Sequence, residues 1–84
     1  MHRLQQGSKV VGTKQTMKAL QLNMVSELYV AEDAKEAQIE PLIHLAEKEL
    51  IPIVYMPSMT ELGKACDVEV RTATAALIVN DGEL

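Results

Sequence analysis

Gly12-Thr13-Lys14-Gln15-Thr16-Met17-Lys18 is the stretch of sequence that decides how this chain begins its fold. Gly12 allows a sharp turn, and the Thr13 hydroxyl is able to cap the free amides of a helix that follows it. The first turn of such a helix exposes N–H groups and carries the positive end of the helix dipole. The stretch therefore predicts a surface that favours an anion, and a phosphate backbone in particular.

The predicted helix has two different faces, because residues three or four positions apart share a side. The polar residues on its exposed face are Lys14, Gln15, Lys18 and Gln21. The residues expected in the core on the opposite face are Met17, Leu20 and Met24. Taken alone, this pattern is also typical of an ordinary surface helix whose lysines serve solubility.

The distribution of charge favours the anion-binding interpretation. Residues 1–26 contain four basic side chains and no acid, namely Arg3, Lys9, Lys14 and Lys18. Residues 27–84 contain the other four bases and all twelve acids, so the formal net charge of -4 is the sum of +4 and -8. This asymmetry indicates a local anionic partner and not a general affinity for nucleic acid.

Composition predicts a single folded domain over residues 1–84, with a small aliphatic core. Hydrophobic residues make up 48% of the chain and charged residues 24%, and the only aromatic residues are Tyr29 and Tyr55. The single cysteine, Cys66, excludes an internal disulfide and suits a reducing compartment. We found no secretory or membrane-spanning stretch, so we expect a soluble, cytoplasmic protein without a membrane partner.

Strands alternate with helices along the sequence. Strands are predicted at residues 9–11, 27–31, 53–56 and 73–79, and helices at about 13–23, 36–50 and 58–66, while residues 1–8 form a turn or a loose arm. Asn23 is a helix stop, Pro41 lies in the first turn of its helix or kinks it, and Asp67 is a left-handed C-cap. Ser58 and Glu61 form a capping box. This order predicts an α/β fold, a three-layer α-β-α sandwich around a small mixed four-stranded sheet.

Several segments, in this order and with these gaps, resemble ribosomal protein L-seven-Ae and its kink-turn RNA-binding relatives, and most of all the short bacterial YbxF-type members. The segments that carry the resemblance are Gly12–Leu20, Val30–Ala34, Ile51–Val54, Ser58–Cys66 and Val68–Ala73. No single motif is decisive, but the ordered set is specific and extends from about Val10 to Val79.

The resemblance implies a non-catalytic protein that binds kink-turns, which are RNA helices bent sharply at sheared G·A pairs beside a bulge. The bend opens a groove that an ordinary A-form helix keeps closed to side chains. The implied partner is a structured RNA that contains a kink-turn, in the ribosome or associated with it. The protein is expected to act as a monomer, without a cofactor, metal or small-molecule substrate.

The resemblance also implies the residues of the site. The backbone of Gly12 and Thr13 would contact phosphate, Lys14 and Gln15 would read the sheared guanines, and Lys18 would contact a base or a phosphate. Glu32 lies in the family's acidic turn, before Asp33. The loop that covers the bulge contains Val68, Glu69, Val70, Arg71 and Ala73.

This chain departs from the family pattern at several positions. Lys-Gln replaces the Asn-Glu that archaeal and eukaryotic relatives usually carry, so an acceptor carboxylate is lost at Gln15. Leu22 stands where several relatives have an arginine, and Lys35 replaces an acid found nearby in some of them. Glu69 and Arg71 make the covering loop more polar, with Arg71 able to contact a phosphate.

Two other function classes remain open alongside RNA binding. One is a protein-interaction or regulatory module that shares the fold, although such a module would have no need of Lys14, Gln15 and Lys18 beside Gly12. The other, a small hydrolase or transferase, lacks an assembled site. His44 is expected to be structural, Cys66 a small core residue, and the sequence contains no zinc-binding spacing or Gly-rich phosphate loop.

Overall fold

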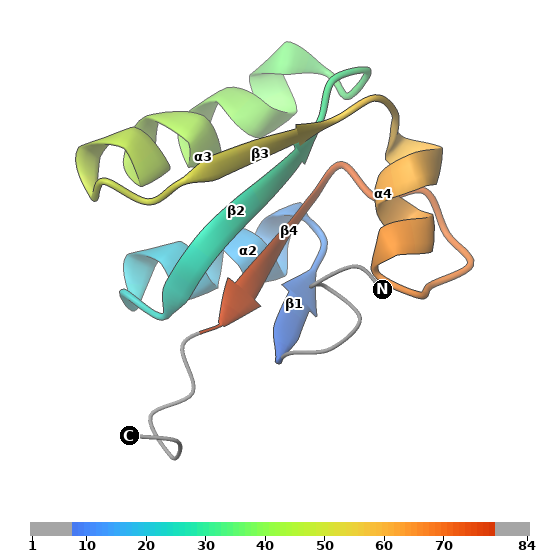
Figure 1. Cartoon of the computed structure of the whole chain (residues 1–84). Helices are drawn as coiled ribbons and strands as arrows, with labels where there is room; N and C mark the ends of the chain where they lie inside the picture. Colours follow the sequence, from blue (N-terminus) through green and yellow to red (C-terminus); the bar gives the residue numbers. More distant parts are fainter. Residues whose placement is uncertain (1–7, 79–84) are drawn as a thin grey trace.

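The computed structural model describes residues 8–78, which form a mixed four-stranded sheet and three helices (Figure 1). In chain order the elements are β1 (Lys9–Val11), α2 (Thr13–Gln21), β2 (Val25–Ala31), α3 (Glu36–Lys48), β3 (Ile53–Met56), α4 (Met59–Ala65) and β4 (Thr74–Ile78). The strand order in the sheet is β1-β4-β2-β3. Strand β4 is antiparallel to both of its neighbours, whereas β2 and β3 are parallel.

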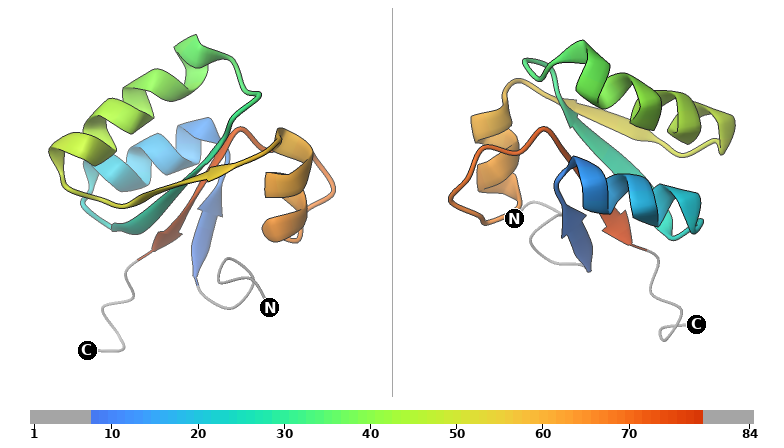
Figure 2. Two further views of the ribbon diagram at one scale, coloured as in Figure 1. Left: turned by 45° about the horizontal axis from the view of Figure 1, so that its top comes forward. Right: turned by 180° about the vertical axis from the view of Figure 1, so that it is seen from behind.

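Helices cover both faces of the sheet, which confirms the predicted three-layer α-β-α sandwich. Helices α2 and α3 lie side by side against one face, and α4 lies against the other face (Figure 2). The alternation of β2 explains this arrangement, because successive side chains of a strand point to opposite faces. Leu28 and Val30 pack toward α2 and α3, while Tyr29 and Ala31 pack toward α4.

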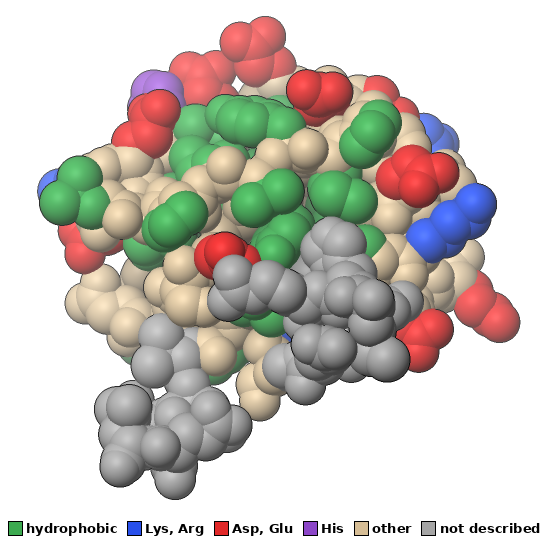
Figure 3. All heavy atoms as spheres, in the orientation of Figure 1, with side chains coloured by type: hydrophobic (Ala, Val, Ile, Leu, Met, Phe, Trp, Pro, Cys, Tyr) green, Lys and Arg blue, Asp and Glu red, His purple; other side chains and the backbone are tan. Residues whose placement is uncertain are grey.

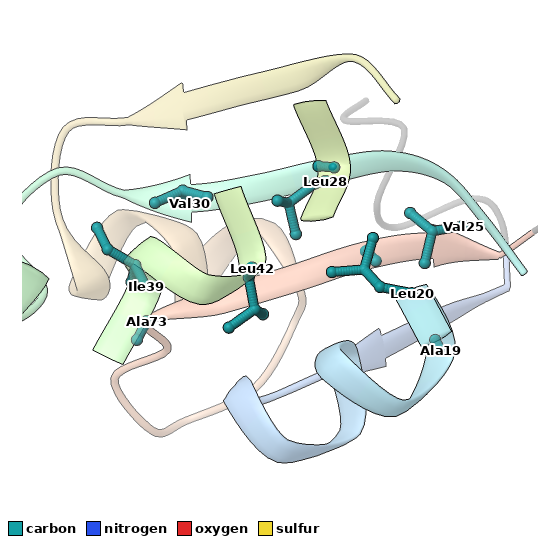
Figure 4. Close-up of a cluster of buried hydrophobic side chains, with 10 residues drawn as sticks. Ala19, Leu20, Val25, Leu28, Val30, Ile39, Leu42 and Ala73 are labelled. Atoms are coloured by element: carbon teal, nitrogen blue, oxygen red, sulfur yellow. The ribbon is translucent and has the colours of Figure 1, made fainter. Parts of the chain in front are cut away.

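The larger core lies between the sheet and the pair α2–α3 (Figure 4). Leu20 of α2, Leu42 of α3 and Leu28 of β2 are almost completely buried there. Burying a leucine side chain contributes about 1.5–3 kcal/mol, so these contacts fix α2 on the sheet. The second core contains Leu62 and Cys66 beside Ala75 of β4.

Local sequence signals mark three of the helix ends. Ser58 caps α4 by accepting a hydrogen bond from the Glu61 N–H at 3.1 Å, as the capping box predicts. Asn23 and Asp67 follow α2 and α4 with φ values of 57° and 61°, which are the predicted left-handed stops. Helices α2 and α3 each end two residues before the predicted boundary, and β2 begins two residues earlier than expected.

Two other boundaries are decided by the structure. Pro41 lies inside α3, beyond its first turn, and α3 continues through this residue to Lys48. Strand β4 begins at Thr74, one residue later than predicted, and Val79, the predicted strand end, lies outside the described residues. The arm predicted for residues 1–8 also lies outside them, apart from Ser8, whose carbonyl accepts a hydrogen bond from the Ile78 N–H at 3.0 Å.

Two predictions about α2 are wrong. Thr13 does not cap the helix, because α2 already begins at Thr13 and Gly12 is its N-cap residue. Met24 does not reach the core: α2 stops at Gln21, and the Met24 side chain is 41% exposed. Thr16, Ala19 and Leu20 are the buried residues of α2, and Met17 is half-buried.

Candidate RNA-binding site

The N-terminal end of α2 is shaped by Gly12. This residue has a φ of 101°, which lies in the region that glycine adopts without strain. Its N–H donates to the Thr74 carbonyl at 2.9 Å, so the helix start is fastened to the beginning of β4. Within residues 8–78, no side-chain hydrogen bond caps α2. The first-turn amides and the positive end of the helix dipole are therefore available to an anion.

The polar residues predicted for the exposed face of α2 are exposed in the structure. Lys14, Gln15, Lys18 and Gln21 all lie at the surface. Lys14 and Gln15 follow directly on the helix start, and Lys18 is one turn further along. The arrangement places one cation and one amide at the end of α2 that carries the positive dipole, and a second cation on the same exposed face in the last turn.

An open hollow of about 610 Å³ runs along this face between α2 and α3. We refer to it as the α2–α3 hollow, and its lining residues are Thr13, Lys14, Gln15, Met17, Lys18, Gln21, Gln38, Pro41 and Leu42. The side chains of Met17 and Leu42 make its floor apolar, whereas lysines and amides form most of its rim. Such a combination suits a ligand with a flat apolar surface and polar edges, as a nucleotide has.

Thr13 connects the helix start to two other elements. Its Oγ1 accepts a hydrogen bond from Gln38 Nε2 of α3 at 3.1 Å and lies 3.5 Å from the donor Thr74 Oγ1 of β4. The hydroxyl that was predicted to cap α2 is therefore used to hold α2 against α3 and the sheet. Its backbone remains at the helix start, where the predicted phosphate contact would form.

The predicted covering loop, residues 68–73, is held against α4 and leads into β4. The Val68 N–H donates to the Gly63 carbonyl at 3.0 Å, and the Thr72 N–H donates to the Met59 carbonyl at 3.1 Å. Gly63 is buried, and a Cβ at this position would collide with the Val70 carbonyl oxygen. The backbone of the loop thus approaches α4 more closely than any larger residue at position 63 would allow.

The side chains of this loop differ in exposure. Val70 is 66% exposed, and Glu69 and Arg71 are also at the surface, so these three are available to a partner. Val68 is half-buried against the core under α4, and Ala73 is buried in the core under α2 and α3. At the end of the loop, the Ala73 carbonyl accepts a hydrogen bond from the Ala31 N–H at 2.9 Å.

The acidic turn after β2 brings the loop and α4 together. Glu32 is exposed, and its N–H donates to the Met56 carbonyl at 2.8 Å. Asp33 accepts a hydrogen bond from the Met59 N–H at 2.8 Å and forms an ion pair with Arg71 at 3.8 Å. The Asp33 carboxylate therefore joins the turn, the start of α4 and the covering loop.

The structure thus brings the start of α2, the end of the loop and the acidic turn to one end of the sheet, where β2 and β3 finish and β4 begins. Gly12 contacts Thr74 at the start of β4, and Ala73 contacts Ala31 at the end of β2. Sequence reasoning missed the contributions of Asp33, Gln38 and Gly63. A glycine inside a short capped helix was a signal for close backbone approach, but the partners of Asp33 and Gln38 lie 26 and 25 positions away.

Charge is unevenly distributed over the surface. Figure 3 shows the side of the molecule that carries α4, where acidic side chains surround a hydrophobic area and few basic side chains are visible. Helix α2, with Lys14 and Lys18, lies behind the sheet in this view. The basic helix face is consequently a local feature of a protein that is acidic elsewhere.

The remaining candidate groups are a buried cysteine and a surface histidine. Cys66 is buried, and this burial raises the pKa of its thiol above the ordinary value of 9.0, so the group is a neutral thiol near pH 7. His44 is exposed on α3, and its Nε2 lies 3.6 Å from Glu40 Oε1. Residues 8–78 contain no cluster of three or more His, Cys, Asp or Glu side chains suited to a metal ion. No helix among them is long and apolar enough to span a bilayer.

Comparison with solved structures first defines the class of the fold. The chain superposes on the 15.5kD RNA binding protein of Giardia lamblia with a TM-score of 0.80 and 25% sequence identity. The match covers 89% of this chain but only 63% of the Giardia protein. The α-β-α sandwich is thus the fold of that protein.

Sequence comparison then gives the family. Residues 2–84 match the Ribosomal protein L7Ae/L30e/S12e/Gadd45 family, and the chain belongs to it. An RNA-binding protein of Halalkalibacterium halodurans is 46% identical over 68 residues, which cover 81% of this chain and 83% of that protein. RNA-binding protein YbxF of Geobacillus stearothermophilus is 41% identical over 75 residues, which cover 89% of this chain and 92% of that protein. The resemblance seen in the sequence is confirmed.

Proposed function

We propose that this protein binds RNA that contains a kink-turn, and that it stabilises the bent form of that RNA without catalysing a reaction. The observation that carries the proposal is the exposed, uncapped start of α2, with Lys14 and Gln15 in its first turn and Lys18 further along the same exposed face. The names of the relatives, which are RNA-binding proteins, support the same class of partner.

Each part of the site has a role in this proposal. The amides at the start of α2 and the lysine ammonium groups bind phosphate, and Lys14 also donates to guanine O6 or N7. Gln15 both donates and accepts hydrogen bonds at a base edge. Val70, exposed on the loop, packs against the nucleotides of the bulge, while Arg71 and Glu32 flank it.

The mechanism is a shift of population between two RNA conformations. A kink-turn interconverts between an extended and a bent form, and a protein that binds only the bent form increases its share. The shift is limited by the difference in affinity for the two forms, so a rigid site is an advantage. The hydrogen bonds that join α2 to β4 and the loop to α4 supply such rigidity.

The proposal is tested by comparing two RNAs in a gel shift or by calorimetry. The first RNA contains a kink-turn, and the second is the same RNA with its sheared G·A pairs replaced by Watson–Crick pairs. The protein should bind the first RNA selectively. Equal affinity for both RNAs would show that binding does not depend on the kink-turn. Absence of binding to either RNA would favour the alternative in which this fold serves as a protein-interaction module.

The double substitution Lys14→Ala and Lys18→Ala should weaken kink-turn binding by a few kcal/mol, because each base-reading contact contributes roughly 1–3 kcal/mol. Both lysines are exposed, so thermal unfolding should stay close to that of the wild type. Lys48→Ala, in the last turn of α3, removes an exposed charge outside the site and should have little effect. Unchanged binding by the double variant would rule out the start of α2 as the site.

A ribosomal or ribosome-associated role in the cytoplasm is part of the proposal, as is action by a monomer. Sedimentation of a cell extract on a sucrose gradient tests the first point, since a ribosomal protein moves with a subunit at moderate salt. Analytical ultracentrifugation of the protein, alone and with one equivalent of kink-turn RNA, tests the second.

A further inference from the structure

The α2–α3 hollow extends the predicted reading face onto a second helix. Residues of α2 form one wall, and α3 contributes Gln38, Pro41 and Leu42. None of these three side chains is charged, and Gln38 is the one with hydrogen-bonding groups. A ligand that fills this hollow therefore lies beside the Gln38 side chain as well as beside Lys14 and Lys18.

The acidic residues of α3 do not line the α2–α3 hollow. Glu36, Glu40 and Glu47 are exposed, but none of them lines the hollow. At 100° per residue they cluster on one side of α3, whereas Gln38 and Pro41 lie on the other side. An acidic helix thus presents an uncharged side to the lysines of α2, which suits a polyanionic ligand between them.

Hydrogen bonds orient the Gln38 side chain. Its Nε2 donates to Thr13 Oγ1 at 3.1 Å, at the start of α2. Thr13 Oγ1 also lies within 3.5 Å of the donor Thr74 Oγ1, so two donors approach its two lone pairs and its own proton is left for another acceptor. Among residues 8–78, no hydrogen bond reaches the amide oxygen of Gln38.

We propose that Gln38 of α3 is a specificity-determining residue of the RNA site, whose amide oxygen accepts a hydrogen bond from an RNA donor in the α2–α3 hollow. The donor is an exocyclic amino group of a purine base or a ribose 2′-hydroxyl. Lysine side chains only donate, so they cannot satisfy such a group. The Gln38 oxygen supplements Gln15 as an acceptor beside Lys14, at a site where relatives with Asn-Glu have a carboxylate.

This inference rests on the proposed kink-turn binding, and the Gln38→Met variant tests it. Methionine has a similar length but neither the amide donor nor the amide acceptor. Position 38 is exposed, so the variant should remain folded, which circular dichroism checks. The variant should bind the intact kink-turn about three- to tenfold more weakly, the effect of one lost hydrogen bond. His44→Met, an exposed position of α3 outside the hollow, is the matched control and should bind like the wild type.

Substituted RNAs identify the donor. Inosine in place of each guanine of the sheared pairs removes the 2-amino group, purine in place of each adenine removes the 6-amino group, and 2′-deoxynucleotides remove the hydroxyl. On the RNA that lacks the donor, the wild type and Gln38→Met should bind equally.

Three results are distinguishable. Failure of the wild type to prefer the kink-turn would overturn the proposed function itself. Selective binding by the wild type, with equal affinity of Gln38→Met for the intact RNA, would overturn only the role of Gln38. A loss that persists on every substituted RNA would also overturn it, because Gln38 would then act only by supporting Thr13.

Discussion

At the scale of the residue, exposure separates the side chains that are able to meet RNA from those that hold the site in place. Lys14, Gln15 and Lys18 lie at the surface, as does Val70 of the covering loop. Thr74 and Ala73 are buried, and they act by positioning the backbone around Gly12 and Ala31. Substitutions of the first group should change binding, whereas substitutions of the second should change stability as well.

Val70→Glu should weaken kink-turn binding at least tenfold without unfolding the protein. The Val70 side chain is 66% exposed, so a carboxylate there remains hydrated in the free protein. In a complex it would face the phosphates of the bulge, and a like-charge contact costs on the order of several kcal/mol.

Calorimetry of RNA binding and thermal unfolding by circular dichroism measure the two effects separately. Val70→Thr keeps the shape of the side chain without its charge, and should retain most of the affinity. Loss of the folded signal in Val70→Glu would show that Val70 supports the core and would contradict its placement at the surface.

At the scale of the element, two segments that are distant in sequence build one end of the molecule. Helix α2 is anchored by Gly12 to β4, and the loop 68–73 is anchored by Gly63 and Met59 to α4. The Asp33 carboxylate connects this loop to the turn after β2. The position of the loop therefore depends on α4, and substitutions in α4 that move the loop should change the affinity for RNA.

Gly63→Ala should destabilise the protein by about 1–3 kcal/mol, the usual cost of overpacking. Alanine is the better helix former by about 1 kcal/mol, but the new Cβ would collide with the Val70 carbonyl, a backbone atom that cannot turn away. The loop must shift, so affinity for a kink-turn should fall as well.

Urea unfolding and RNA titration measure these changes, with Thr60→Ala on the exposed side of α4 as the control. A gain in stability of the size that helix propensity alone predicts, together with unchanged RNA binding, would contradict the close approach of loop and helix.

At the scale of the whole molecule, a net charge of -4 coexists with a basic helix face. The acidic remainder of the surface repels nucleic acid that does not fit the site, so specificity arises partly from charge placement. Affinity should nevertheless depend on salt, because bound lysines release counterions from the RNA.

The slope of log affinity against log salt concentration should decrease by about one for each of Lys14 and Lys18 that is removed. Lys48→Ala, outside the site, should leave this slope unchanged. Titrations of the same RNA at several salt concentrations measure it. An equal change in slope for all three variants would show that the lysines act only through net charge.

Much of the fold was predictable because its boundaries carry local signals. Ser58, Asn23 and Asp67 each mark a helix end through their own backbone or side-chain chemistry. The apolar run at the end of β2 likewise marks a strand that is buried on both faces. Helix α2 was misjudged at both ends. Gly12 takes the cap position expected of Thr13, and the chain turns at Asn23 before Met24 is able to reach the core.

The candidate site was predictable only in part. The exposed residues of α2 follow from helical periodicity, whereas the roles of Gln38 and Asp33 depend on contacts across the fold. Gly63 was visible in the sequence, but its partner Val70 was not. The roles of these three residues depend on contacts with residues far away in the chain, and a single sequence does not reveal such contacts.

The hydrogen bond between Gly12 and Thr74 has a consequence for how the protein is made. Strand β4, the last described element, inserts between β1 and β2. The ribosome must therefore synthesise β4 before the hydrogen bond between Gly12 and Thr74 can form at the start of α2. A nascent chain that ends before Thr74 already contains Lys14 and Lys18 but has no completed end of the sheet to hold them. RNA recognition would thus begin only once β4 has left the translation machinery and joined the sheet.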